Sequence, residues 1–228
     1  MRKINSLVIR FVKGVMVALF TIGISVIFTL NLKVIYNYCI DKFNLNNVVN
    51  LKKEDIMLDY KNLINYLQNP FNKKLTFNNF IMSKNGEIHF FEVKRIFLFI
   101  YLAVVVILFI ALIYLLIKKI NNKKLYIYKD LNYGANTLIG FICIIAFSMY
   151  LDFSKAFIMF HKIFFRNDYW IFDESLDPII KVLPEEVFMI YAVIILILIL
   201  IFILSYKIYY YKNINKNKIM INNIKLSR

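Results

Sequence analysis

The chain has 228 residues, of which 61% are hydrophobic, and its mean hydropathy is +0.63. Soluble domains are about 45–50% apolar on a similar count, so this composition favours a membrane protein over a soluble globular one. The formal net charge is +15, and the length suits a single integral membrane domain over residues 1–228 better than two globular domains.

Four apolar runs are predicted to cross a bilayer as helices, over residues 14–32, 96–117, 131–151 and 187–206. A hydrocarbon core about 30 Å thick needs about 20 apolar residues in a helix. The first run is too long for a signal peptide and no small-residue cleavage site follows it, so we expect it to remain as an anchor. The sequence therefore predicts an all-α membrane protein with four transmembrane helices.

The run 131–151 gives the weakest of these signals, because two asparagines and a threonine interrupt its first half. It carries no charge between Asp130 and Asp152. Gly134 and Gly140 are expected to let it pack closely against a neighbouring helix, as small residues do in membranes.

The basic residues indicate how the chain is oriented. The segments 1–13, 118–130 and 207–228 together carry 15 basic residues and one acid. Positively charged loops stay in the cytoplasm, so both termini are predicted to be cytoplasmic and segments 33–95 and 152–186 extracytoplasmic. Orientation, together with attraction to anionic membrane lipids, accounts for the charge, and no nucleic-acid partner is predicted.

The two extracytoplasmic segments are rich in aromatic and charged residues, as expected for elements at headgroup level. In the first, apolar residues at helical spacing predict an amphipathic helix over 55–68, which Asn69 and Pro70 end. Two placements fit this helix: on the bilayer surface as an interfacial helix, or packed against the ends of the spans. Cys39 and Cys143 are expected to be unpaired thiols.

The two histidines of the chain lie in these extracytoplasmic segments. His89 precedes the second span, and a helix beginning near Glu87 would place His89 and Glu92 on one face. A carboxylate beside an imidazole can fix its tautomer and raise its basicity. His161 is followed by a cluster of hydrogen-bond donors and acceptors: Arg166, Asn167, Asp168 and Trp170.

Three chemistries use such residues. The histidines with Glu87, Glu92 or Asp168 could bind a divalent metal, but the HExxH pattern is absent and no metal or other cofactor is predicted. A serine hydrolase needs an activated nucleophile, and no serine lies in a GxSxG motif. Acid–base catalysis by two histidines, on a substrate that brings its own nucleophile, needs the fewest protein groups.

Two blocks of sequence resemble a known family. The stretch EIHFFEVK begins at Glu87, and FHKIFFRNDYW with its trailing DPII and LPEEVF begins at Phe160. Both resemble the lipoprotein intramolecular transacylase family, four-span plasma-membrane proteins of some Gram-positive bacteria. The resemblance covers most of the chain, with the same number of spans and order of loops.

The resemblance implies a reaction and a substrate. The family moves the acyl chain at the sn-2 position of a diacylglyceryl-modified lipoprotein onto the α-amine of its N-terminal cysteine, which gives a lyso-form lipoprotein. It implies that His89 and His161 are central. Acid–base chemistry then predicts that one removes a proton from the amine and the other returns one to the leaving oxygen. Arg166, Asn167 and Trp170 are the expected oxyanion donors.

Other functions stay open on sequence grounds. A non-enzymatic membrane module, such as an immunity protein, an assembly factor or a small receptor, would use the histidines to bind lipid headgroups. A metal-dependent membrane hydrolase would use them as ligands and would release a fatty acid.

Overall fold

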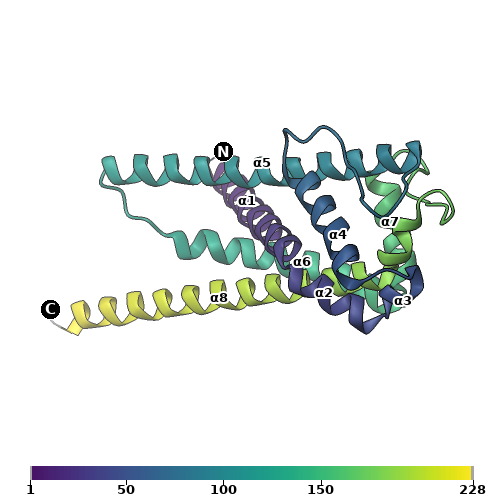
Figure 1. The fold of residues 1–228 in the computed structure, drawn as a ribbon. Helices are drawn as coiled ribbons and strands as arrows, with labels where there is room; N and C mark the ends of the chain where they lie inside the picture. Colours follow the sequence, from purple (N-terminus) through teal and green to yellow (C-terminus); the bar gives the residue numbers. More distant parts are fainter. Residues whose placement is uncertain (1, 227–228) are drawn as a thin grey trace. The chain divides into compact units, whose positions relative to one another are not determined.

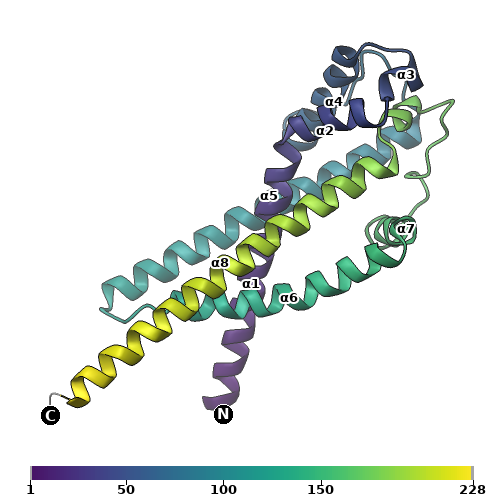
Figure 2. The same ribbon diagram turned by 90° about the horizontal axis from the view of Figure 1, so that it is seen from below.

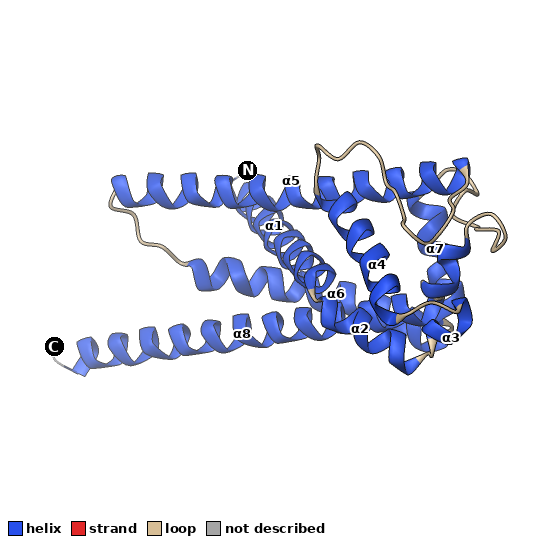
Figure 3. Ribbon diagram, in the orientation of Figure 1, coloured by secondary structure: helices blue, strands red, loops and turns tan. Residues whose placement is uncertain are grey.

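The computed structural model describes the backbone of residues 2–226 and the side chains of residues 7–217 and 219. Within that part the chain is helical and contains no β-strand (Figures 1 and 3). The elements in chain order are α1 (Arg2–Asn31), α2 (Lys33–Lys42), α3 (Leu45–Val49), α4 (Lys53–Gln68), α5 (Lys84–Ile120), α6 (Ile127–Leu151), α7 (Phe153–Phe164), the 3₁₀ helix η1 (Pro178–Val182) and α8 (Glu185–Leu226).

Four helices among the described residues are long and apolar enough to cross a membrane: Leu7–Asn31, Lys84–Ile120, Ile127–Leu151 and Glu185–Asn217. Each covers one of the four predicted runs to within a residue, so the predicted all-α class and the number of spans are confirmed. This includes the third span, whose hydropathy signal was the weakest of the four.

The chain divides into two compact units, which we describe one at a time. Unit 1 consists of Met1–Ser25, Ala103–Ala146 and Leu196–Arg228, and unit 2 consists of Val26–Leu102 and Phe147–Ile195. Each unit therefore contains part of every one of the four long helices, and unit 2 also contains α2, α3, α4, α7 and η1.

In unit 1, α1 and α6 approach closely at Gly134. A Cβ atom at this position would lie 2.3 Å from Cγ1 of Val17, so only glycine allows the contact. A Cβ atom at Gly140 would meet nothing within 4 Å. The prediction of close packing is therefore confirmed for Gly134 and wrong for Gly140, which faces away from the neighbouring helices.

The two asparagines and the threonine of α6 have hydrogen-bond partners on α8 or within α6 itself. Lys207 donates hydrogen bonds to the side-chain oxygens of Asn132, at 3.0 Å, and Asn136, at 2.6 Å. The hydroxyl of Thr137 bonds the carbonyl oxygen of Tyr133 one turn earlier. These contacts explain why polar residues are tolerated in an otherwise apolar helix, because an unpaired polar group is costly to bury.

Unit 2 has a continuous hydrophobic core. Here α3 packs against η1 and α2, and α2 packs against α4 (Figure 2). The core includes Tyr36, which stacks on Tyr60 with 3.8 Å between ring centroids and donates a hydrogen bond to the carbonyl of Val182. The thiol of Cys39 is buried in this core, and both cysteines are unpaired as predicted.

The predicted amphipathic helix is α4, which begins two residues earlier than expected. Its apolar residues Ile56, Leu63, Ile64 and Leu67 are all buried in the core of unit 2. This supports the second of the two predicted placements, in which the apolar face packs inside the protein. The buried Asp59 on the same helix accepts hydrogen bonds from the backbone of Asn78 and Asn79, which fastens the loop after α4.

Candidate active site

The two histidines both lie in unit 2, on different helices. His89 is in the second turn of α5, and His161 is near the end of α7. Their side chains are 6% and 8% exposed, so both imidazoles are removed from bulk solvent. Their ring centroids are 6.0 Å apart, which is close enough for both rings to act on one reacting centre.

The position of His89 depends on how α5 begins. Ser83 precedes the helix, and its hydroxyl oxygen accepts a hydrogen bond from the backbone N–H of Gly86 at 3.0 Å, as an N-cap does. The backbone N–H and the hydroxyl of Ser83 both donate to the buried carboxylate of Asp177, at 2.7 and 2.6 Å. Asp177 thus joins the start of α5 to the loop that follows α7.

Gly86 makes that junction possible. A Cβ atom there would lie 2.4 Å from Oδ1 of Asp177, too close for any other residue without displacing the carboxylate. The helix starts at Lys84, nearly a turn before the start near Glu87 that was assumed when His89 and Glu92 were placed on one face. The signal in the sequence was Ser83, a typical N-cap residue directly before the helix.

The position of His161 is set by α7. Asp152 caps this helix by accepting a hydrogen bond from the backbone N–H of Lys155 at 3.0 Å. Nδ1 of His161 lies 2.8 Å from the carbonyl oxygen of Phe157. A carbonyl only accepts hydrogen bonds, so Nδ1 carries the proton and the lone pair of the neutral ring is on Nε2.

Aromatic side chains surround both imidazoles. Phe165 contacts the two rings, with centroids 4.7 Å from His89 and 5.5 Å from His161. Trp170 stacks on His161 at 4.7 Å, and Phe172 lies edge-on to His89 at 5.4 Å. The surroundings are therefore apolar, and electrostatic interactions within them are stronger than in water.

Three polar atoms in this region are buried and have no hydrogen-bond partner among the described residues: Nδ1 of His89, Oε2 of Glu92 and Nε1 of Trp170. Leaving a buried polar group unsatisfied costs about 1–3 kcal/mol. Since few such groups occur in a folded protein, three around one pair of histidines indicate a site that binds a polar ligand group.

Glu92 is held in place by Asn167. The amide of Asn167 donates to Oε1 of Glu92 at 2.9 Å, and its side-chain oxygen accepts from the backbone N–H of Tyr169. No hydrogen bond joins Glu92 to His89, although the two share α5 as predicted. The expected pairing of carboxylate and imidazole is therefore replaced by a contact with Asn167, in the segment that follows α7.

The other predicted site residues lie outside this arrangement. Glu87, Arg166 and Asp168 are exposed. None of their side chains makes a hydrogen bond or an ion pair within the described part of the chain. The structure thus brings together five of the eight predicted residues, and sequence analysis missed the aromatic walls formed by Phe157, Phe165 and Phe172.

Burial shifts the titration of His161. The apolar surroundings disfavour the charged ring and lower the pKa of His161 below its ordinary value of 6.5, which the hydrogen bond to Phe157 only partly opposes. The ring is therefore neutral at pH 7, with Nε2 able to accept a proton. Among the described residues, no group of three or more His, Cys, Asp or Glu side chains is arranged to hold a metal ion.

Comparisons with known proteins identify the family to which the chain belongs. The sequence profile described as lipoprotein intramolecular transacylase Lit matches residues 11–188. The solved structure of the membrane integral lipoprotein intramolecular transacylase Lit from Bacillus cereus is 30% identical, with a TM-score of 0.85 over 96% of this chain and 100% of that one. No curated protein sequence matches.

Two further solved structures are of variants of the Bacillus cereus enzyme in which one histidine is changed. The arginine variant is 29% identical with a TM-score of 0.80, over 96% of each chain. The alanine variant is 31% identical with a TM-score of 0.78, over 95% of this chain and 97% of that one. The chain therefore belongs to the lipoprotein intramolecular transacylase family and is a membrane-embedded acyltransferase.

Proposed function

We propose that the enzyme transfers the sn-2 acyl chain of a diacylglyceryl-modified lipoprotein to the α-amine of its N-terminal cysteine, with His89 and His161 as the catalytic residues. The observation that carries this proposal is the pair of buried imidazoles 6.0 Å apart, beside three buried polar atoms without partners. The transfer needs proton movement and oxyanion stabilisation, and these residues supply both.

The reaction balances without water or a cofactor. The amine nitrogen forms a bond to the sn-2 ester carbonyl, and the bond between that carbonyl and the glyceryl oxygen breaks. The amine loses one proton and the leaving oxygen gains one. Because nucleophile and ester belong to one molecule, holding them in contact can contribute up to about 7–11 kcal/mol, and less for the medium-sized ring formed here.

His161 acts as the base in this proposal. Its Nδ1 proton is engaged by Phe157, so Nε2 accepts the proton that the attacking amine releases. The imidazolium so formed gives this proton to the leaving glyceryl oxygen, and the ring returns to its starting state. Such general acid–base catalysis contributes about 10²–10⁴-fold.

The remaining polar atoms bind the reacting groups. The N–H groups of His89 and Trp170 donate to the oxyanion that forms at the ester carbonyl, which is the role proposed for Trp170 from sequence. Oε2 of Glu92 accepts a hydrogen bond from the amine and orients it toward the ester, while Asn167 holds the carboxylate. His89 therefore stabilises charge in this proposal. The sequence predicts that the second histidine returns the proton, without deciding which of the two it is.

The site faces the extracytoplasmic side of the plasma membrane in this proposal. The basic segments place both termini in the cytoplasm by the positive-inside rule. On α7, His161 is buried while the apolar side chains of Met159 and Ile163 are 62% and 69% exposed. This exposed apolar surface suits an interfacial helix in contact with lipid, from which acyl chains reach the histidines.

Expression in a host that makes only diacylglyceryl lipoproteins tests the function. Mass spectrometry of the N-terminal lipopeptide is expected to show an unchanged total mass with one acyl chain moved to the amine. His89→Asn and His161→Asn should each lower product by about 10²-fold or more, within the range of acid–base and oxyanion effects.

The control is Lys162→Gln, which changes an exposed neighbour of His161 and should leave the product unchanged. Thermal unfolding in detergent checks that the histidine variants remain folded. Loss of a fatty acid from the lipopeptide would indicate a hydrolase, and undiminished product from both histidine variants would refute the mechanism.

A further inference from the structure

Unit 1 contains a cavity of about 530 Å³ that is separate from the residues of the histidine site. The volume lies within the range of about 300–1,000 Å³ that is typical of small-molecule sites. Its lining comes from α1, α5, the loop after α5, α6 and α8. The lining residues are mostly basic or tyrosine: Ile9, Arg10, Lys13, Tyr114, Lys118, Lys124, Tyr126, Lys129, Asp130, Asn132, Tyr133, Tyr210 and Ile214.

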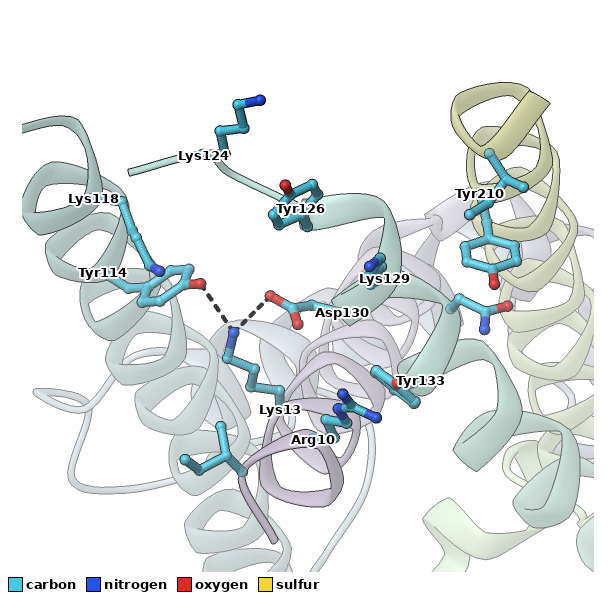
Figure 4. Close-up of a pocket in the computed structure, with 13 residues that line it drawn as sticks. Arg10, Lys13, Tyr114, Lys118, Lys124, Tyr126, Lys129, Asp130, Tyr133 and Tyr210 are labelled. Carbon is cyan, nitrogen blue, oxygen red and sulfur yellow. Dashed lines mark hydrogen bonds and ion pairs between the residues drawn. The ribbon is translucent and has the colours of Figure 1, made fainter. Parts of the chain in front are cut away.

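The lining is strongly cationic. It holds five basic side chains and one carboxylate, that of Asp130. Asp130 is occupied by Lys13, which lies 2.9 Å away and also donates to the hydroxyl of Tyr114 at 3.0 Å (Figure 4). The other four basic side chains have no ion-pair partner within the described part of the chain, so the cavity has an excess of positive charge.

Aromatic residues hold these cations in place and add hydrogen-bond donors. The ammonium group of Lys118 lies 5.6 Å from the ring of Tyr114, and that of Lys129 lies 4.8 Å from the ring of Tyr126. Since the hydroxyl of Tyr114 accepts from Lys13, its own proton is free to donate. Cations and hydroxyl donors around one space are the groups that bind a phosphate.

The position of these residues along the helices places the cavity at headgroup level. The uncharged run 96–117 of α5 spans roughly 33 Å at about 1.5 Å per residue, which matches a hydrocarbon core. Lys118 follows this run directly, and Lys13 directly precedes the uncharged run 14–32 of α1. Lys13 of α1 and Lys118 of α5 are therefore the charged residues that border the two apolar runs, and both line the cavity.

We propose that this cavity binds the phosphate headgroup of an anionic membrane lipid. The phosphate lies among Lys13, Lys118 and Lys129 and accepts a hydrogen bond from Tyr114, while the acyl chains follow the apolar helices. The ligand is a lipid rather than a free anion, because the lining includes the apolar side chains of Ile9 and Ile214 and lies next to the apolar runs of the spans. The site is additional to the one that binds the lipoprotein.

Native mass spectrometry of the full chain in detergent, titrated with phosphatidylglycerol, tests this proposal. The wild type is expected to retain one phosphatidylglycerol per chain in preference to phosphatidylcholine. The double variant Lys118→Gln with Lys129→Gln should bind on the order of tenfold more weakly, since each lysine near a lipid surface contributes to anion attraction. Replacing the same two lysines by arginine should restore retention.

The matched control is Lys119→Gln with Lys123→Gln, which removes the same charge from exposed positions of the same region that do not line the cavity. Equal weakening by both pairs would overturn the proposal, because it would show a general charge effect. Displacement of the lipid by millimolar inorganic phosphate or glycerophosphate would also overturn it, by showing that the cavity takes a free anion. Thermal unfolding without added lipid confirms that the variants are folded.

Discussion

The ring of His161 makes one hydrogen bond to the described residues, and this bond decides which ring nitrogen can take a proton. With Nδ1 donating to Phe157, only Nε2 is available, and burial keeps the ring uncharged at neutral pH. The substrate amine has a pKa of about 7.7–8.0 and must also be neutral to attack. Two titrations of different groups therefore shape the pH dependence of the reaction.

The pKa of His161 is lowered, so its protonation is expected to limit the rate only below its ordinary value of 6.5. Between pH 6.5 and 7.5 the logarithm of kcat/KM should rise by about one unit per pH unit, from the amine alone, and more steeply below that interval. A pH profile in detergent checks this. A second break at or above pH 6.5 would contradict the lowered pKa.

The same shift predicts a change in stability. The folded protein binds a proton on His161 less readily than the unfolded chain, so stability is lost as pH falls through 6.5 toward the lowered pKa. Thermal unfolding of the wild type should show this loss, and His161→Asn should show less of it. An identical pH dependence of Tm in both proteins would contradict the shift.

The side-chain amide of Asn167 holds the carboxylate of Glu92. Removing this amide tests whether the position of the carboxylate matters for activity. Asn167→Ala is expected to lower activity by roughly 10- to 150-fold, since losing one hydrogen bond to a charged group costs about 1.5–3 kcal/mol and about 1.4 kcal/mol is a factor of ten in rate. The fall should appear in both kcat and kcat/KM, because the amine is oriented for attack by this carboxylate. Activity equal to that of the Lys162→Gln control would show that Glu92 does not bind substrate.

At the scale of elements, the start of α5 is the junction on which the site depends. Gly86→Ala places a methyl group on the carboxylate of Asp177, which must then move away from Ser83. We expect a loss of about 1–3 kcal/mol in stability, together with lower activity because His89 is in the next turn.

The same substitution at Gly140 provides the control for this prediction. An added Cβ atom there meets nothing within 4 Å, and alanine is a better helix former than glycine. Gly140→Ala should therefore keep or raise the Tm in detergent. Equal behaviour of the two variants would show that the contact between Gly86 and Asp177 does not matter.

Local patterns predicted much of the fold, because hydropathy and helical spacing depend on neighbouring residues alone. They gave the four long helices and the buried face of α4. They did not give the link between Ser83 and Asp177, because these residues are far apart in sequence and no local pattern relates them. The same limit applied to α6, whose asparagines are satisfied by Lys207 on another helix.

Part of the candidate site could also be predicted from local sequence patterns. The histidines, Glu92, Asn167 and Trp170 stood out as polar or aromatic groups before apolar spans. Phe165 and Phe172 did not, since phenylalanine is abundant in this chain and nothing local marks which ones form the walls. The partner of Glu92 was also hidden, because Asn167 is 75 residues away in the sequence, in the segment that follows α7.

For the whole molecule, the proposed orientation has a direct test. Single cysteines introduced as Lys73→Cys and Glu174→Cys lie in the two segments predicted to be extracytoplasmic, while Lys123→Cys and Lys212→Cys lie in segments predicted to be cytoplasmic. In a background lacking Cys39 and Cys143, only the first two should react with a membrane-impermeant thiol reagent on intact cells. Labelling of one of these two and not the other would place the segments on opposite sides.

The proposed reaction is an intramolecular transfer that His161 promotes as the base. The most direct measurement uses two synthetic diacylglyceryl lipopeptides of different peptide mass, one of which carries an isotopic label on its sn-2 acyl chain alone. After incubation with purified enzyme, the label should appear on the amine of its own peptide and on no other, and His161→Asn should abolish this product. Label on the second peptide, transfer of the sn-1 chain, or undiminished transfer by His161→Asn would contradict the account.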